Sequence, residues 1–195
     1  MAETQQHERD AGTAERALDV AEKLVQTRGF NGFSYAHVAA DLGITKASLH
    51  YHFPGKAELG EALISRYAER FASALARIDA ERPTARERLE AYVELYADVL
   101  VGQRMCLCGM LAAEYETLPP PMATAIIGFF DANQAWLTTV LESGRSDGTL
   151  SFTGDAEEAA QAVIGTLEGA MLIARPYRDL ARFHAAARRL LDGLV

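Results

Sequence analysis

The amino-acid sequence predicts an all-α fold of about nine helices, and three observations support this fold class. Apolar residues recur at intervals of three and four positions in nearly every segment. No run of β-branched residues alternates with polar ones, as a half-buried strand would require. With 195 residues, of which 49% are hydrophobic, the chain is long enough to bury a substantial core.

The first three predicted helices begin at side chains that can cap a helix N-terminus. The apolar stripe that follows Thr13 predicts a first helix with this residue as its N-cap. Ser34 is expected to cap a short second helix that ends at Gly43. Thr45 is expected to cap a third that reaches about His52, so the two short helices form a helix-turn-helix unit.

The remaining predicted helices are separated by Pro or Gly residues. Apolar side chains recur at every fourth position from Leu59 to Leu75, which predicts a long helix that Pro83 ends. The others are expected between Thr84 and Gly102, Cys106 and Tyr115, Met122 and Ser143, Asp155 and Pro176, and after Pro176.

Charge is unevenly distributed along the chain. The formal net charge of −8 argues against unspecific adhesion to nucleic acid or anionic lipid. The stretch from Gly43 to Lys56, GITKASLHYHFPGK, nevertheless holds two lysines and two histidines without any acid. Because acids would repel phosphate, this local pattern predicts a surface that meets DNA.

Polar side chains on and near the third helix supply donors for base edges and phosphates. The predicted DNA-binding residues are Ser34, Tyr35, Thr45, Lys46, Ser48, His50, Tyr51, His52 and Lys56, with Ser34, Tyr51 and Lys56 assigned to backbone phosphates. The alternative is an ordinary helical hairpin whose histidines are merely solvated. A zinc site at the two histidines is not expected, because residues two apart lie on different faces of a helix.

The run SYAHVAADLGITKASLHYHFPGKAEL resembles the DNA-binding domain of the TetR family of ligand-responsive transcriptional repressors. His50 departs from the pattern, since the family usually has a tyrosine there. The resemblance implies an N-terminal three-helix helix-turn-helix DNA-binding domain at residues 1–57 and a larger helical ligand-binding and dimerisation domain at 58–195. It also implies a homodimer that pairs through its last two helices, a palindromic double-stranded DNA operator, and release by a small-molecule effector.

The penultimate predicted helix independently favours close helix packing. Small residues, Ala and Gly, recur between Ala159 and Ala170 and would let another helix approach closely. The alternative is that these small residues serve packing within one chain.

Aromatic and flexible side chains on the middle helices predict an apolar cavity of the kind that binds small molecules. The ligand-binding candidates are Tyr67, Tyr96, Cys106, Met110, Phe130, Trp136, Glu168 and Met171. Any one of these residues is more often part of a core than of a ligand site.

The tract MCLCGMLAAEYETLPPPM is similar to a branch of the same family that senses reactive electrophiles, quinones or related aromatic compounds. The similarity implies an aromatic or electrophilic effector and Cys106 as the sensing residue, while Arg175 stands where some members have a lysine. Cys106 is expected near a helix N-terminus, which favours a thiolate, and Cys108 is expected to pack inertly. Covalent and non-covalent sensing both remain open.

No enzyme, cofactor or metal site is expected. An enzyme would use Cys106 or Cys108 as nucleophile, but His184 is the only histidine outside the N-terminal unit and nothing marks it as a partner base. No signal peptide or membrane-spanning stretch is recognisable, which predicts a cytoplasmic protein without a membrane partner. The alternative function is a helical small-molecule-binding module without a DNA function.

Overall fold

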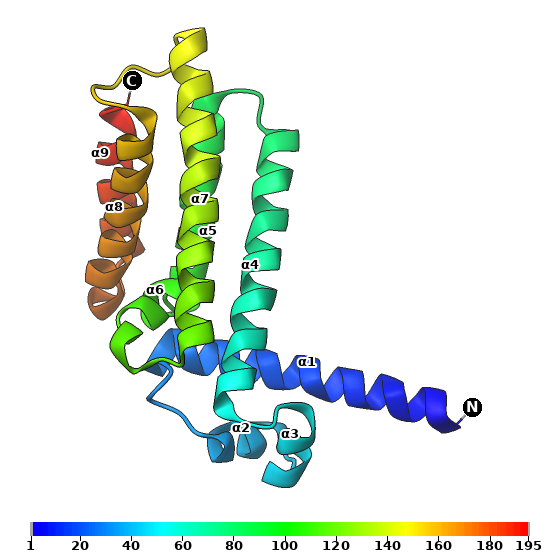
Figure 1. The fold of residues 1–195 in the computed structure, drawn as a ribbon. Coiled ribbons are helices and arrows are strands. Elements are labelled where there is room, and N and C mark those ends of the chain that lie inside the picture. Colours follow the sequence, from blue (N-terminus) through cyan, green and yellow to red (C-terminus); the bar gives the residue numbers. More distant parts are fainter. Residues whose placement is uncertain (1, 195) are drawn as a thin grey trace. The chain divides into compact units, whose positions relative to one another are not determined.

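The computed structural model describes the backbone of residues 2–194 and the side chains of residues 12–194. All regular structure in this described part is helical, which confirms the predicted fold class (Figure 1). The elements are α1 (Ala2–Arg28), α2 (Tyr35–Leu42), α3 (Lys46–His52), α4 (Lys56–Glu81), α5 (Ala85–Val101), α6 (Leu107–Ala112), η1 (Tyr115–Thr117), α7 (Pro120–Asp147), α8 (Ala156–Tyr177) and α9 (Leu180–Asp192).

Several helix ends lie where capping chemistry predicts them. The Thr45 side chain accepts a hydrogen bond from the backbone N–H of Ser48 at 3.1 Å and begins α3. Asp155 accepts from the backbone N–H of Glu158 at 2.7 Å and begins α8. Gly43 ends α2 in the left-handed conformation, with φ of 65°, which glycine adopts without a steric penalty.

Other boundaries differ from the prediction. Helix α1 begins at Ala2 rather than at Thr13, so the helix continues through Gly12 although glycine disfavours a helix interior. Helix α6 begins one residue after Cys106 and is shorter than predicted. Helix α7 is longer at both ends, since a proline is tolerated in the first turn of a helix and Gly144 does not end the helix before Asp147.

The first compact unit contains the chain up to Tyr67 together with Leu107–Ile126. Within it, α1 packs against α2, α3 and α6. The core of this unit includes fully buried Val25, Val38, Leu49 and Leu59. The helix-turn-helix pair therefore rests on α1, with one face of α3 left exposed.

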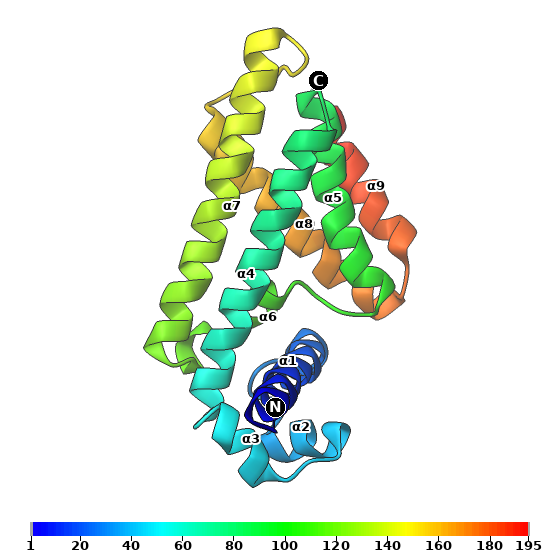
Figure 2. The same cartoon turned by 90° about the vertical axis from the view of Figure 1, so that its right-hand side faces the viewer.

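The second compact unit contains Ala68–Cys106 and the chain from Ile127 onward. Helices α8 and α9 run antiparallel side by side, and α5 packs against both (Figure 1, Figure 2). Fully buried Leu89, Val163, Leu167 and Phe183 fill the space between these three helices. The division into a DNA-binding domain at residues 1–57 and a ligand-binding and dimerisation domain at 58–195 remains a prediction.

None of the described helices is both long enough and apolar enough to cross a membrane.

Candidate DNA-binding surface and effector site

Helix α3 presents a polar face to solvent and an apolar face to the core. Lys46 is exposed, and the Tyr51 ring is 76% exposed, which is unusual for a tyrosine with no other role. Leu49 is fully buried against the first unit. Thr45 and Ser48 lie at the N-terminal end of the same face, where the cap hydrogen bond holds them in place.

The two histidines of α3 are held by neighbouring rings. The His50 ring packs on the Tyr35 ring with centroids 4.7 Å apart, and its Nδ1 lies 3.0 Å from the Pro54 carbonyl oxygen. The His52 ring contacts the Tyr51 ring edge-on at 5.2 Å. Both histidines therefore restrict the orientation of the aromatic side chains beside them.

Tyr35 has a structural task that differs from the predicted DNA contact. Its ring is buried, and its hydroxyl donates to the carbonyl oxygen of Phe53 at 2.8 Å and also lies against that of Gly55. Burial, with a smaller effect of Glu58, raises the pKa of the Tyr35 hydroxyl to about 12. The neutral hydroxyl thus ties α2 to the turn that follows α3, and the prediction for Tyr35 is corrected accordingly.

Lys56 also differs from its predicted task. Its ammonium group donates to the carbonyl oxygens of Phe30 and Phe33, the latter at 2.6 Å. It lies 4.5 Å and 4.4 Å from the centroids of the same two phenylalanine rings. Burial lowers the pKa of this lysine, and Glu114 opposes that effect. Because the ammonium group faces these partners, we replace the predicted phosphate contact of Lys56 with a role in holding the loop before α2.

Glu114, just after α6, holds the same loop from another side. Its Oε2 accepts hydrogen bonds from the backbone N–H groups of Phe30 at 2.7 Å and Asn31 at 3.1 Å. The Asn31 side-chain amide donates to the Thr117 hydroxyl at 2.8 Å. A Cβ at Gly29 would lie 2.4 Å from Glu114 Oε1, so the close approach needs glycine. The sequence alone left two roles open for Glu114, orienting a ligand or lying in solvent, and did not predict this contact with the loop.

Ser34 is the N-cap residue of α2 and remains exposed. Its backbone N–H donates to Nδ1 of His37 at 3.1 Å. The first turn of α2 is free of acids, so a phosphate could approach there without repulsion. The phosphate contact of Ser34 stays a prediction.

The second unit contains a buried polar cluster that we call the tyrosine cluster, made of Tyr92, Tyr96, Asn133, Cys106 and Glu168. The hydroxyls of Tyr92 and Tyr96 lie 3.0 Å apart, and that of Tyr92 donates to Asn133 Oδ1 at 3.2 Å. Burial is the main reason why the pKa values of both tyrosines lie well above the usual value. The hydroxyls are therefore neutral hydrogen-bonding groups at any physiological pH.

Cys106 and Glu168 complete the tyrosine cluster. The Cys106 thiol is hydrogen-bonded to the Glu168 carboxyl group and is 1% exposed. Burial raises the pKa of Glu168, while the hydrogen bond with Cys106 lowers it. Oε1 of Glu168 is buried and has no hydrogen-bond partner among the residues that the structure describes. Such an atom can accept a hydrogen bond from a ligand.

Three further ligand candidates lie in the same unit. The Trp136 ring stacks on the Tyr92 ring at 5.5 Å, and its Nε1 donates to Asp79 at 2.9 Å. Phe130 is half-buried and Met171 is fully buried. Tyr67 and Met110 belong to the first unit, and their part in ligand binding stays a prediction.

Sequence reasoning missed two members of the tyrosine cluster. Tyr92 was assigned to the core because it lies on the apolar stripe of α5, and Asn133 was not singled out. One signal was present: Asn133 interrupts the apolar stripe of α7, and a buried amide needs polar partners. Both polar atoms of the Asn133 side chain form hydrogen bonds, since Oδ1 accepts from Tyr92 and Nδ2 donates to the Phe129 carbonyl oxygen at 2.8 Å.

Two family models match the chain. Residues 17–63 match the model described as "Bacterial regulatory proteins, tetR family". Residues 71–190 match the model described as "Tetracyclin repressor-like, C-terminal domain".

Similar proteins have been described in several bacteria. The transcriptional regulator AcuR of Cereibacter sphaeroides is 30% identical over 172 residues, which cover 85% of this chain and 78% of that protein. The HTH-type transcriptional repressor NemR of Escherichia coli is 26% identical over 171 residues, which cover 86% of each. A crystal structure of a TetR-family transcriptional regulator from Agrobacterium tumefaciens superposes with a TM-score of 0.92 at 33% identity and covers 95% of this chain and 99% of that one.

Proposed function

Because the chain belongs to the TetR family of bacterial regulatory proteins, we propose that it is a homodimeric transcriptional repressor whose α3 helices read a palindromic operator. The acid-free, exposed face of α3 carries this proposal. Lys46 and Tyr51 supply donors on this face, and a helix of this kind fits the major groove. Recognition helices about 34 Å apart would meet successive turns of DNA.

A mobility-shift assay with the DNA upstream of the gene tests the reading surface. Exchanging both Lys46 and Tyr51 for Ala is expected to abolish the shift, because the two exposed side chains are lost while buried Leu49 is kept. Circular dichroism serves as the control, since helicity should not change. A double variant that binds DNA like the parent would show that α3 is not the DNA-recognition helix. Absence of any shift in the parent would favour a small-molecule-binding module without a DNA function.

We infer that the dimer forms through α8 and α9. Gly165 and Gly169 of α8 are exposed and have open space where a Cβ would lie. One turn further on, Leu172 and Ile173 are 62% and 56% exposed. These four positions follow the i, i+4, i+7, i+8 pattern of one helix face, so the face is apolar and allows a close approach. A second copy of the same helix is the partner that family membership supports.

The effector acts, in this proposal, at the tyrosine cluster. Cys106 is the reactive group, and the effector is an electrophile such as a quinone. A group added to the thiol would have no space in the buried cluster and would break the hydrogen bond with Glu168. A non-covalent effector would instead donate a hydrogen bond to Glu168 Oε1. The similarity of the tract around Cys106 to the electrophile-sensing branch favours the covalent reaction.

The route from Cys106 to DNA follows the covalent chain. Cys106 is bonded to Leu107, the first residue of α6, and Glu114 follows α6 after one residue. Glu114 in turn holds the backbone of Phe30 and Asn31 before α2. A shift of α6 would therefore move the loop that positions the helix-turn-helix pair, so that the effector favours a conformation with poor operator affinity.

Two cysteine variants test the sensor. Cys106→Ser is expected to bind the operator like the parent but to lose release by quinones, because serine is a far weaker nucleophile. Cys108→Ser is the matched control, since Cys108 is also buried but lies on α6, and it should keep both properties. If Cys106→Ser responds to every electrophile that releases the parent, sensing is non-covalent.

The proposal includes a cytoplasmic location, where thiols stay reduced, and no catalysis. Both cysteines are free and buried. Repression needs only two conformations with different DNA affinity, so neither cofactor nor catalytic group is required.

A further inference from the structure

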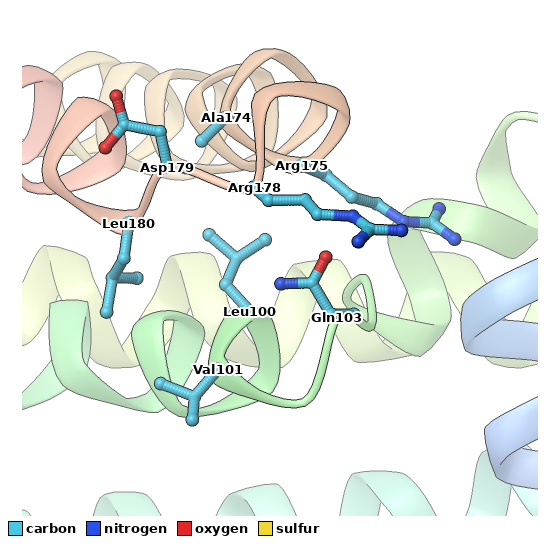
Figure 3. Close-up of a pocket in the computed structure, with 8 residues that line it drawn as sticks. All are labelled: Leu100, Val101, Gln103, Ala174, Arg175, Arg178, Asp179 and Leu180. Atoms are coloured by element: carbon cyan, nitrogen blue, oxygen red, sulfur yellow. The ribbon is translucent and has the colours of Figure 1, made fainter.

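A hollow lies in the same unit as the tyrosine cluster but shares none of its residues. It is formed where α5 ends and where α8 turns into α9, and it has a volume of about 220 Å³. Figure 3 shows the residues that line it, which are Leu100, Val101, Gln103, Ala174, Arg175, Arg178, Asp179 and Leu180.

The lining is divided into a polar side and an apolar side. The side chains of Arg175 and Arg178 extend together past the amide of Gln103 (Figure 3). Leu100, Val101 and Leu180 lie on the other side. A neighbouring hollow shares the same three polar residues and is also lined by Leu172, which belongs to the proposed dimer face.

The acidic residue of the hollow does not neutralise the two arginines. Asp179 Oδ1 accepts hydrogen bonds from the backbone N–H groups of Ala181 at 3.0 Å and Arg182 at 3.3 Å, which caps α9. Its carboxylate points away from Arg175 and Arg178 (Figure 3). Arg178 has no ion-pair partner in the described part of the chain. The positive charge of Arg178 beside the hollow is thus not compensated by an ion pair, in a chain of net charge −8.

Backbone strain is concentrated at the same hollow. Gln103 and Arg178 have φ angles of 58° and 51°, and no other described residue except glycine has a positive φ. The left-handed conformation is sterically unfavourable for a residue with a Cβ. Arg178 is the left-handed C-cap of α8, and both residues with positive φ line the hollow with a polar side chain.

We propose that this hollow binds a small organic carboxylate with an apolar ring or short chain. Guanidinium groups present paired donors that match the two oxygens of a carboxylate, and the Gln103 amide adds a third donor. The leucines and Val101 cover the apolar part of the ligand. The volume is below the usual range for drug-sized ligands, which selects a molecule of the size of benzoate. Inorganic phosphate carries the charge but would leave the apolar side empty.

Benzoate binding, followed by chemical shifts of the backbone amides in an NMR titration, tests the proposal on the full chain. The parent is expected to bind in a saturable way, with the largest shifts at residues 100–103 and 174–180. Arg175→Gln and Arg178→Gln should each weaken binding about tenfold, since each removes one charged donor. Arg189→Gln, which removes an exposed arginine of α9 outside the hollow, should leave the affinity unchanged.

Gln103→Gly provides an independent variant. Glycine relieves the positive φ, so the melting temperature should rise while benzoate affinity falls through loss of the amide. Cys106→Ser should bind benzoate like the parent, which separates this site from the proposed sensor.

Three results would overturn the assignment. They are benzoate affinity unaffected by both arginine variants, equal binding of benzyl alcohol, and displacement of benzoate by an equal concentration of inorganic phosphate. The first would place the ligand elsewhere, the second would remove the role of charge, and the third would remove the role of the apolar side.

Discussion

At the scale of single residues, the direction of a side chain decides its role. Lys46 and Lys56 lie close together in sequence and were both expected to meet DNA. The structure exposes Lys46 but turns Lys56 toward two carbonyl oxygens and two phenylalanine rings. The first lysine is available to phosphate, whereas the second stabilises the loop.

This difference predicts opposite effects of two matched substitutions. Lys56→Met should lower the free energy of unfolding by about 1–3 kcal/mol, because charge-assisted hydrogen bonds are lost while the aliphatic stem is kept. The slope of log affinity against log salt should not change. Lys46→Met should reduce that slope by about 0.9 and change the free energy of unfolding by less than about 0.5 kcal/mol. Urea denaturation and salt titrations measure both, and a lower slope in Lys56→Met would restore its phosphate contact.

Glu168 gives the stability of the protein a pH dependence. Its pKa in the folded state is raised by burial above the ordinary value of 4.5, so the folded state binds the proton more tightly than the unfolded chain. The contribution of Glu168 to stability is fully present below pH 4.5 and is lost as pH rises through the raised pKa. In Glu168→Gln the free energy of unfolding should therefore decrease less as the pH rises above 4.5. Urea denaturation at several pH values measures this difference.

The exposed Glu142 of α7 is the matched control for this measurement. Glu142→Gln should leave the pH profile of the parent intact. A profile that is equally steep in Glu168→Gln would show that other groups cause the pH dependence.

At the scale of elements, α8 combines two faces with different tasks. Val163, Leu167 and Met171 are buried within the second unit. Gly165 and Gly169 lie on the opposite, exposed face together with Leu172. The same helix thus serves a core and, as proposed, a dimer interface.

The dimer interface predicts a position-specific effect of a bulky charge. Gly169→Glu should shift the protein from dimer to monomer, because the side chain would enter the space that a second α8 needs. Sedimentation velocity measures the change. Gly128→Glu is the control, since Gly128 of α7 is equally exposed and also has open space at its Cβ. A dimer that persists in Gly169→Glu would place the interface elsewhere.

At the scale of the whole molecule, the sequence predicts the helices better than the contacts between them. The starts of α2, α3, α5 and α8 were predictable because N-capping is a local interaction between a side chain and the next turn. The start of α1 and the end of α7 were not, since each helix continues through a glycine, Gly12 or Gly144, that locally disfavours a helix. Gly144 even lies inside α7, where the absence of a side chain leaves room for Leu150 and Ala85.

The candidate sites were predictable only in part for the same reason. The polar pattern of α3 is local and predicts an exposed reading face. The tyrosine cluster joins residues from α5, α7 and α8 with Cys106, and no local pattern predicts that Tyr92, Asn133 and Glu168 meet. The left-handed backbone of Gln103 and Arg178 gives no signal either, because neither residue type favours that conformation.

The position of Lys56 also makes the chain unusually simple to follow by chemical labelling. The sequence contains only three lysines, of which Lys23 and Lys46 are exposed and Lys56 is held by the loop before α2. Among its lysines, an amine-reactive reagent therefore has two ready targets and one protected one, all within the first unit. Acylation of Lys56 reports that the loop has opened, and protection of Lys46 reports that the reading face is covered, so one mass spectrum records both states.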